Sequence, residues 1–391
     1  MKKLLLLLLI SSFIIGIYSC GGSSSNSDLN KEFEFVKVDS LVMDILKTVH
    51  ILDYHHEKEL YLIIPQMSME GRFMIIDKEG QIVAENTLAE GPDAFGLVTA
   101  RVGFVGDEIM VVTEGKTFVY DLNLKVLRNF SFEQGIRFRL INFTRDNLST
   151  FKTKDGNISA VVNMNDEFLQ TYPVDYFDTL NMVHLQNVKT GEIKKGGKID
   201  ESSAFKQGVF IPFMDNPIYF SDLNSTSVSS MMWGDSILYQ MDPNDNFKIV
   251  NKINLERITP NRLITVPLEE ATRAAVQEHR GNNVKFGGAF FEITGYGDEI
   301  LIGYRTGSDP NMVFENPSEE QQRLETESRK KHYFYIKDGK QVGKPVEWNL
   351  PGKIQLNVGP NRYLQYGDQA ELHDFEKDYQ CYYIYELREK S

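Results

Sequence analysis

Residues 333–342 have the sequence YFYIKDGKQV, which is one copy of a pattern that recurs along the chain. An apolar, aromatic run ends in an Asp-Gly turn and a second short run follows, which is the pattern of a β-hairpin. A sixth copy of the pattern begins at Tyr382 and lacks a second strand. The other four copies lie earlier in the chain, at residues 73–83, 118–127, 183–193 and 237–250.

The turns of these six units recur along the chain with spacings of 44, 66, 55, 96 and 48 residues. Repeats of about 40–50 residues with four strands each are typical of propeller blades, and the larger spacings indicate insertions. We therefore predict an all-β fold, a six-bladed β-propeller, with a seven-bladed ring or an irregular β-solenoid as the alternative. The six turn positions are Asp77, Asp121, Asn187, Asp242, Asp338 and Glu386.

Residues 33–38 alternate between apolar and charged side chains and have no partner in the first repeat. An open ring would leave exposed strand edges on its first and last blades. We therefore predict that residues 33–38 close the ring by completing the sixth blade beside residues 380–386. Residues 31–391 would then form a single propeller domain.

Two insertions near the fifth blade are predicted to be short helices. Residues 267–281 begin with a proline and acidic residues and end with basic residues before a glycine. Residues 316–331 begin with Asn316 as the N-cap, a proline at the first helical position and Glu319 at the third. If the strands of a blade are called A to D in chain order, the B–C and D–A loops share one side of the disc. Both helices should lie on that side, opposite the short A–B and C–D turns.

The N-terminus has the three parts of an export leader. Two lysines precede an apolar run at residues 4–17, which is shorter than the roughly 20 residues that a membrane span requires. The pair Ser19-Cys20 follows, and a small residue before a cysteine resembles the lipobox of bacterial lipoproteins, in which the thiol carries diacylglycerol. We expect residues 1–19 to be a lipoprotein signal peptide and Cys20 to be lipidated. An ordinary secretory signal is the alternative.

Residues 20–30 are rich in Gly, Ser and Asn and are predicted to form a flexible tether. No acidic residue directly follows Cys20, so we expect an outer-membrane lipoprotein that faces the periplasm or the cell surface. The formal net charge is −13, which argues against a nucleic-acid partner. The second cysteine, Cys381, lies in an aromatic run and is predicted to be a small buried side chain.

Function is predicted on the helix-bearing side, because binding residues gather on variable loops that a rigid scaffold holds. The candidate residues come from the two predicted helices and from the loop between the first two blades. They are Glu90, Gly91, Pro92, Asp93, Phe95, Arg273, His279, Arg280 and Arg323.

The Gly91-Pro92 pair, the lipobox, the tether and the strand rhythm together resemble a family of lipoproteins from Bacteroidetes-type bacteria. This domain-of-unknown-function family has six-bladed propellers similar to the TolB and NHL propellers. The resemblance implies a fold and a cell compartment, and it carries no catalytic motif.

His55-His56-Glu57 has residue types that bind zinc. Neighbouring residues of a strand point to opposite faces, however, so we predict a solvated A–B turn there rather than a metal site. The sequence contains no HExxH, GxSxG, SxxK or Walker A motif, and we assign no catalytic residue, metal or cofactor. The leading hypothesis is a binding or scaffold propeller for a protein, peptide or glycan. The alternative is a metal-dependent hydrolase or lactonase with its site in the central channel.

Overall fold

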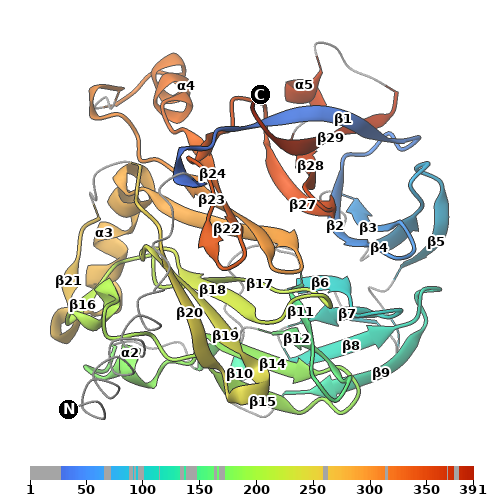
Figure 1. Ribbon diagram of the computed structural model, residues 1–391, viewed down its shortest axis with the longest axis horizontal. Coiled ribbons are helices and arrows are strands. Elements are labelled where there is room, and N and C mark those ends of the chain that lie inside the picture. The colour runs from blue at the N-terminus through green and yellow to red at the C-terminus, as the bar shows by residue number, and fades with distance from the viewer. Residues whose placement is uncertain are drawn as a thin grey trace, which may run out of the picture.

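The computed structural model of the chain is a ring of six antiparallel sheets, which form the blades of a β-propeller (Figure 1). Five of these sheets have four strands, and the fifth blade has a fifth, short strand. The six-bladed, all-β prediction is therefore confirmed. The structure describes residues 28–391 except 66–71, 88–90, 92–93, 96–100, 114, 133–135, 138–147, 163–164, 167–171, 259–262, 313–315, 368 and 374–377.

Each of the first three blades runs in chain order from an inner strand A to an outer strand D. Blade 1 has β2 (Val49–His55), β3 (Leu60–Pro65), β4 (Arg72–Ile76) and β5 (Ile82–Thr87). Blade 2 has β6 (Arg101–Phe104), β7 (Ile109–Val112), β8 (Lys116–Tyr120) and β9 (Val126–Ser131). Blade 3 has β11 (Thr150–Lys152), β12 (Ile158–Val161), β14 (Val183–Asn187) and β15 (Ile193–Gly196).

The last three blades follow the same order, except that the outer strand of blade 6 comes from the N-terminus. Blade 4 has β17 (Pro217–Phe220), β18 (Val228–Met232), β19 (Ile237–Asp242) and β20 (Lys248–Asn254). Blade 5 has β22 (Ala289–Tyr296), β23 (Glu299–Arg305), β24 (Lys331–Lys337), β25 (Lys340–Gln341) and β26 (Val346–Glu347). Blade 6 has β27 (Lys353–Gly359), β28 (Arg362–Tyr366), β29 (Gln380–Glu389) and β1 (Phe33–Met43).

Strand β1 pairs antiparallel with β29 along its whole length, from Phe33 opposite Glu389 to Met43 opposite Gln380. The pairing includes residues 33–38, which the sequence placed beside this strand. It joins the two ends of the described chain in one sheet, so blade 6 has no open edge where a fourth strand is missing.

The five C–D hairpins that the sequence predicted are all present, and an Asp or Asn side chain organises several of them. The Asp77 carboxylate accepts a hydrogen bond from the backbone N–H of Gln81 at 2.8 Å. The Asp121 carboxylate accepts two, from Asn123 and Lys125, each at 2.9 Å. A short acceptor that binds the N–H groups two to four residues ahead favours a tight turn, which explains why these residues mark the repeat.

Aromatic side chains fill the space between neighbouring blades. Six tyrosines are among the largest side chains that are fully buried, and the Tyr382 hydroxyl donates to the carbonyl of Val49 in the next blade at 3.0 Å. Large rings suit this position because they bury much apolar area and keep one polar end for a hydrogen bond. Cys381 is also buried, as predicted. The six tyrosines are Tyr120, Tyr239, Tyr304, Tyr333, Tyr363 and Tyr382.

The first predicted helix is α3 (Arg273–Phe286), which begins and ends later than the sequence indicated. The Thr272 side chain caps it by accepting from the N–H of Ala275, whereas Pro267 belongs to a short strand, β21 (Val266–Pro267). The glycine at 281 lies inside the helix and does not end it. The helix begins after Thr272 because the Thr272 side chain binds a backbone N–H that the first helical turn leaves without a partner.

The second predicted helix is α4 (Glu319–Glu327), and its N-cap is Ser318 rather than Asn316. Ser318 and Gln321 form a capping box, in which each side chain accepts from the backbone N–H of the other residue. Asn316 adopts a left-handed conformation with φ of 55°, which lies outside the helix. The helix is therefore shorter than the predicted range of 316–331.

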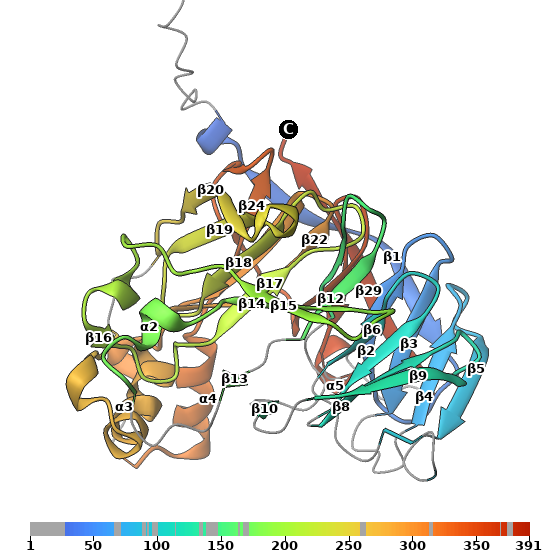
Figure 2. The same cartoon turned by 90° about the horizontal axis from the view of Figure 1, so that it is seen from below.

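The disc has two unlike faces (Figure 2). The A–B and C–D turns form one, which we call the turn face. The B–C and D–A loops form the other, which we call the helix face, because α3 and α4 lie there as predicted. The remaining short elements are η1 (Asp28–Asn30), η2 (Ala204–Lys206), η3 (Pro243–Asp245), η4 (Leu268–Glu270), η5 (Pro310–Met312), α2 (Tyr176–Thr179), α5 (Gln369–Leu372), β10 (Ile136–Arg137), β13 (Asn165–Asp166) and β16 (Val209–Phe210).

Candidate functional site

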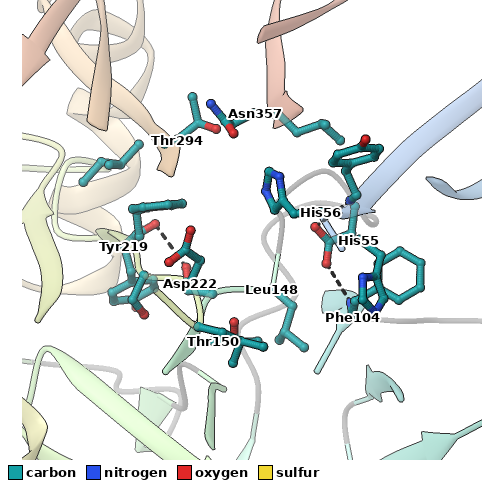
Figure 3. A pocket seen from close by; sticks show the side chains of 18 of the residues that line it. His55, His56, Phe104, Leu148, Thr150, Tyr219, Asp222, Thr294 and Asn357 are labelled. Atoms are coloured by element: carbon teal, nitrogen blue, oxygen red, sulfur yellow. Dashed lines mark hydrogen bonds between the residues drawn. The ribbon is translucent and has the colours of Figure 1, made fainter. Parts of the chain in front are cut away.

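A cavity of about 350 Å³ lies in the central channel and reaches the turn face. Inner strands or A–B turns of all six blades contribute to its wall. Figure 3 shows side chains from opposite sides of the ring, such as His56, Asp222 and Asn357, pointing into the same space. A volume of this size, with a few fixed polar groups, is typical of a small-molecule site.

Three neighbouring inner strands, β22, β27 and β2, each carry a β-bulge where they line the cavity. The pairing register shifts between Phe290 and Glu292 in blade 5, between Ile354 and Leu356 in blade 6, and between Ile51 and Asp53 in blade 1. A bulge places two residues opposite one and so changes the direction of the side chains that follow it. The bulges in blades 5, 6 and 1 thus bring polar residues such as Asp53 and Glu292 to the cavity wall.

Asp53 lies in the cavity wall and joins blade 1 to blade 2. Its carboxylate accepts hydrogen bonds from the backbone N–H groups of Phe104, at 2.6 Å, and Tyr54, at 2.8 Å. Gly103 permits this approach, because a Cβ atom there would lie 2.6 Å from the Asp53 carboxylate. Burial raises the pKa of Asp53 to about 7, and the charge of Asp222 acts in the same direction, whereas the two N–H donors oppose it.

Asp222 lies across the cavity in the A–B turn of blade 4. It accepts from the N–H of Asn224 at 2.8 Å, from the Ser225 hydroxyl at 3.0 Å and from the N–H of Gly297 in blade 5 at 2.8 Å. These donors are neutral, so they position the carboxylate without cancelling its charge.

The His55-His56-Glu57 turn differs from the prediction of a solvated turn on a plain face. His55 is 7 % exposed and packs against Phe104, with ring centroids 5.2 Å apart. His56 lies between two tyrosine rings, with centroid distances of 5.1 Å to Tyr54 and 4.9 Å to Tyr296 of blade 5. Burial lowers the pKa of His56, which keeps the ring neutral at pH 7. The two histidines point in different directions, as expected. Each nevertheless packs against a neighbouring blade, His55 against blade 2 and His56 against blade 5.

Two cationic side chains also line the cavity, and each has a partner within the protein. The Arg101 guanidinium lies 5.3 Å from the centroid of the Tyr219 ring. The Lys353 ammonium binds the Glu292 carboxylate at 3.0 Å, and the Tyr333 hydroxyl donates to the same carboxylate at 2.7 Å. The Lys353–Glu292 pair links blade 5 to blade 6.

The predicted interaction residues on the two helices lie on the helix face, away from the cavity. Arg273 and Arg280 are exposed on α3, and the Arg280 guanidinium lies 4.4 Å from the centroid of the Phe213 ring. His279 is half-buried on the same helix. Arg323 is exposed on α4 and forms ion pairs with Glu320 and Glu327 of its own helix.

The inter-blade loop contributes less to this face than the sequence suggested. Phe95 is 7 % exposed and packs against Phe73, at a centroid distance of 4.9 Å, so it belongs to the core between blades 1 and 2. A large aromatic side chain is more stable when it is buried between two blades than when it is exposed to water. Gly91 is exposed with φ of 103°. Cys20, Glu90, Pro92 and Asp93 lie outside the described residues.

Within the described part of the chain, no three His, Cys, Asp or Glu side chains are grouped as metal ligands would be. The same residues contain no helix with the length and apolarity that crossing a membrane requires. The cavity wall does hold groups that can exchange protons or bind polar ligands, namely a carboxyl group with a pKa near 7 and a neutral imidazole.

Comparison with known proteins supports the fold. No protein-family model and no curated protein sequence matches the chain. A solved structure of a member of the DUF4221 family from Bacteroides vulgatus is similar, with a TM-score of 0.65 and 14 % identity over 92 % of this chain and 100 % of that chain. At this identity the likeness is one of fold, and it agrees with the resemblance to Bacteroidetes-type propellers. BamB from Moraxella catarrhalis (TM-score 0.39, 11 % identity, 90 % of this chain and 100 % of that chain) and the Neurospora crassa Pan2 WD40 domain (0.39, 9 %, 88 % and 97 %) also match.

Proposed function

We propose that the protein is a lipid-anchored binding protein of the bacterial outer membrane whose propeller holds a small polar ligand in the central cavity. The observation that supports this proposal is the geometry of the cavity. Its wall is built from all six blades and encloses about 350 Å³. Side chains that six packed sheets hold in place lose little further freedom when a ligand binds, so such a site is suited to recognition.

The anchor is proposed from the leader and from Cys20, and the start of the fold supports it. Asp28 is fixed on blade 5, because its carbonyl accepts from the N–H of Gly343 at 2.8 Å and its carboxylate pairs with Lys340 at 3.2 Å. Seven residues, or eight Cα-to-Cα steps, therefore separate Cys20 from Asp28, the first described residue. A chain of that length spans at most about 28 Å, which would keep the propeller close to the membrane surface.

A protein, peptide or glycan partner on the helix face is a second candidate, and one observation favours it. Glu325 of α4 is buried and pairs with Lys285 of α3 at 2.8 Å and with Arg329 at 3.0 Å. This network fixes the two helices to each other, and the apolar side chains of Met312 and Leu324 are exposed beside it. Exposed apolar groups on a rigid support are typical of a contact surface.

The cavity function can be tested by filling the cavity. Thr294 lies in the wall and is 5 % exposed, so Thr294→Phe should occupy space that a ligand needs. A library of small polar metabolites is screened by thermal shift against the mature chain and against this variant. Binding that raises the melting temperature of the wild type and is lost in Thr294→Phe is expected. Thr326→Phe, an equal change at an exposed position of α4, is the control and should keep it. Ligand responses that both variants retain would place the site elsewhere.

The anchor can be tested separately. Cys20→Ala removes the thiol that would carry the lipid, so the folded domain should move from the membrane fraction to the soluble fraction. Fractionation followed by immunoblotting measures this. A variant that stays in the membrane fraction would contradict the lipid anchor and leave the cavity function in place.

A further inference from the structure

The cavity wall carries more negative than positive charge. Its only described cationic side chains, Arg101 and Lys353, are each engaged with a partner, as shown above. Asp107 at the rim pairs with Lys58 at 3.1 Å. The wall thus contains five carboxylates and two permanent cations. The five are Asp53, Glu57, Asp107, Asp222 and Glu292.

Asp53 and Asp222 form no ion pair among the described residues, and neither does the exposed Glu57. The oxygens of Asp53 and Asp222 accept only from backbone N–H groups and from one serine hydroxyl. The two carboxylates also repel each other electrostatically, because the charge of Asp222 contributes to the raised pKa of Asp53. Two carboxylates that repel each other across a cavity are stabilised by any cation that enters between them.

The neighbouring surface is aromatic. His56 and Tyr54 line the cavity beside the carboxylates, and Tyr296, which is not among the lining residues, packs against the His56 ring. Electron-rich ring faces attract cations and pack well against alkyl groups. The combination of carboxylates and aromatic rings is the usual surrounding of a bound ammonium group.

A buried hydroxyl gives an independent indication of a ligand. Ser221, next to Asp222, is 2 % exposed and lines the cavity. Its Oγ atom has no hydrogen-bond partner in the described part of the structure. Buried polar atoms are nearly always paired, so an unpaired hydroxyl in the wall is the pattern expected where a partner comes from outside the protein.

We propose that the ligand of the central cavity is a small organic cation, with an ammonium group between Asp53 and Asp222 and an alkyl portion against His56 and Tyr54. This inference rests on the proposed function of the cavity and specifies its ligand class. The ammonium group donates up to three hydrogen bonds, and the Asp53 and Asp222 carboxylates can accept them.

Binding should depend on pH in a stated direction. Above about pH 7 Asp53 is ionised and binds the cation, whereas below it the carboxyl group is neutral. Burial lowers the pKa of His56, so above pH 7 the ring is neutral and does not repel a cation. Affinity should therefore fall as the pH decreases, by up to about tenfold per pH unit below 7. The other titratable or charged groups of the wall are His55 and Glu57 of blade 1, Arg101 and Asp107 of blade 2, Asp222 of blade 4, Glu292 of blade 5 and Lys353 of blade 6.

The test uses three probes of one shape and different charge, namely hexylammonium, 1-hexanol and hexanoate. Each is titrated calorimetrically into the mature chain at pH 8 and again at pH 6. Hexylammonium is expected to bind at pH 8, about tenfold more weakly at pH 6, and more tightly than either of the other probes. Asp53→Asn should weaken it by at least about tenfold and remove the pH dependence. Asp121→Asn is the matched control, because Asp121 also accepts two backbone N–H groups but lies in an outer C–D turn.

Each outcome decides between the two proposals. Equal binding of hexylammonium and hexanol, or tighter binding of hexanoate, would overturn the cation and keep a cavity that binds small molecules. A neutral metabolite from the thermal-shift library whose binding is lost in Thr294→Phe, with no response to hexylammonium, would do the same. If neither the probes nor the library respond, both proposals fail. The pH series on the wild type needs no substitution, so it decides the case even if Asp53→Asn does not fold.

Discussion

The turn face and the helix face of the propeller are built from different kinds of sequence. The helix face carries long, contiguous insertions, and α3 and α4 are visible in the sequence as charged segments with caps. The turn face has short loops, yet the cavity opens there, and its wall takes a few residues from each of six strands spread over some 300 residues. Length of a loop is therefore a poor guide to where this fold concentrates its polar groups.

The two faces should also respond differently to substitution. The cavity depends on close approaches between inner strands, so a single added atom can disturb it. The helix face depends on one ion-pair network and on side chains that already contact water. Substitutions that separate the two responses test whether the faces are independent.

The largest effect is expected for Gly103→Val in blade 2. A Cβ atom at this position would lie 2.6 Å from the Asp53 carboxylate and 2.7 Å from the Leu148 side chain. Either the inner strands move apart or Asp53 loses its hydrogen bonds, so the free energy of unfolding should fall by about 3 kcal/mol. Urea unfolding followed by fluorescence measures it.

The control for this variant lies in the same blade. No described atom lies within 4 Å of the position that a Cβ atom would take at Gly115, so Gly115→Val should change the stability by less than about 0.5 kcal/mol. Wild-type stability in Gly103→Val would show that the contact between blades 1 and 2 is not tight, and the account of Asp53 would fail with it.

The second prediction concerns the helix face. Glu325→Ala removes a buried carboxylate that pairs with Lys285 and Arg329 and contacts the Ser308 hydroxyl at 3.2 Å. Loss of one member of a buried network leaves its partners unsatisfied, so a loss of about 2 kcal/mol is expected. Hydrogen exchange should show faster opening of α3 and α4, with the inner strands unchanged. Glu319→Ala, at an exposed site of α4, is the control. Faster exchange in β2 or β17 would mean that the two faces are coupled.

The fold was predictable because its determinants are local. Each C–D hairpin combines an apolar strand with an Asp or Asn whose side chain organises the turn, as Asp77 and Asp121 do. Ring closure by β1 followed from a count of strands. Helix boundaries were wrong by several residues, because candidate caps compete. Ser318 rather than Asn316 is the N-cap of α4, because Gln321 lies at the position that completes a capping box with Ser318.

The cavity was not predictable in the same way, because nothing local distinguishes its residues. Asp53 sits in an ordinary strand, and its role comes from a bulge and from the backbone of Phe104 in the next blade. Asp222 resembles any other turn residue. His55-His56 was the one visible signal, and alternation along the strand argued correctly that both rings cannot share a face. It could not indicate that Tyr296 of blade 5 lies against one of them.

The third prediction measures the electrostatic cost of the cavity. The pKa of Asp53 is raised from its usual 3.8 to about 7, so between these values the folded protein binds more protons than the unfolded chain. The contribution of Asp53 to the free energy of unfolding should therefore decrease as the pH rises from 4 to 7. Asp53→Asn removes this loss. The stability of the variant minus that of the wild type should therefore be larger at pH 8 than at pH 4, by roughly 1 to 3 kcal/mol. Thermal unfolding at both pH values tests it, and Asp121→Asn should show no comparable gain. A constant difference between wild type and Asp53→Asn would mean that the carboxylate is well solvated.

The smallest effect on stability is expected for Arg323→Ala, and this is what makes it useful. Its side chain is 60 % exposed, and its ion pairs with Glu320 and Glu327 lie on the surface of α4, where such pairs contribute little. The free energy of unfolding should change by less than about 0.5 kcal/mol, and binding in the cavity should be unchanged. If the helix face binds a macromolecular partner, the same substitution should weaken that complex, because an exposed Arg on a rigid helix is a frequent contact residue. Lys116→Ala, an exposed cation in blade 2, is the control. A partner that binds Arg323→Ala and wild type equally would leave the turn face as the functional side of the disc.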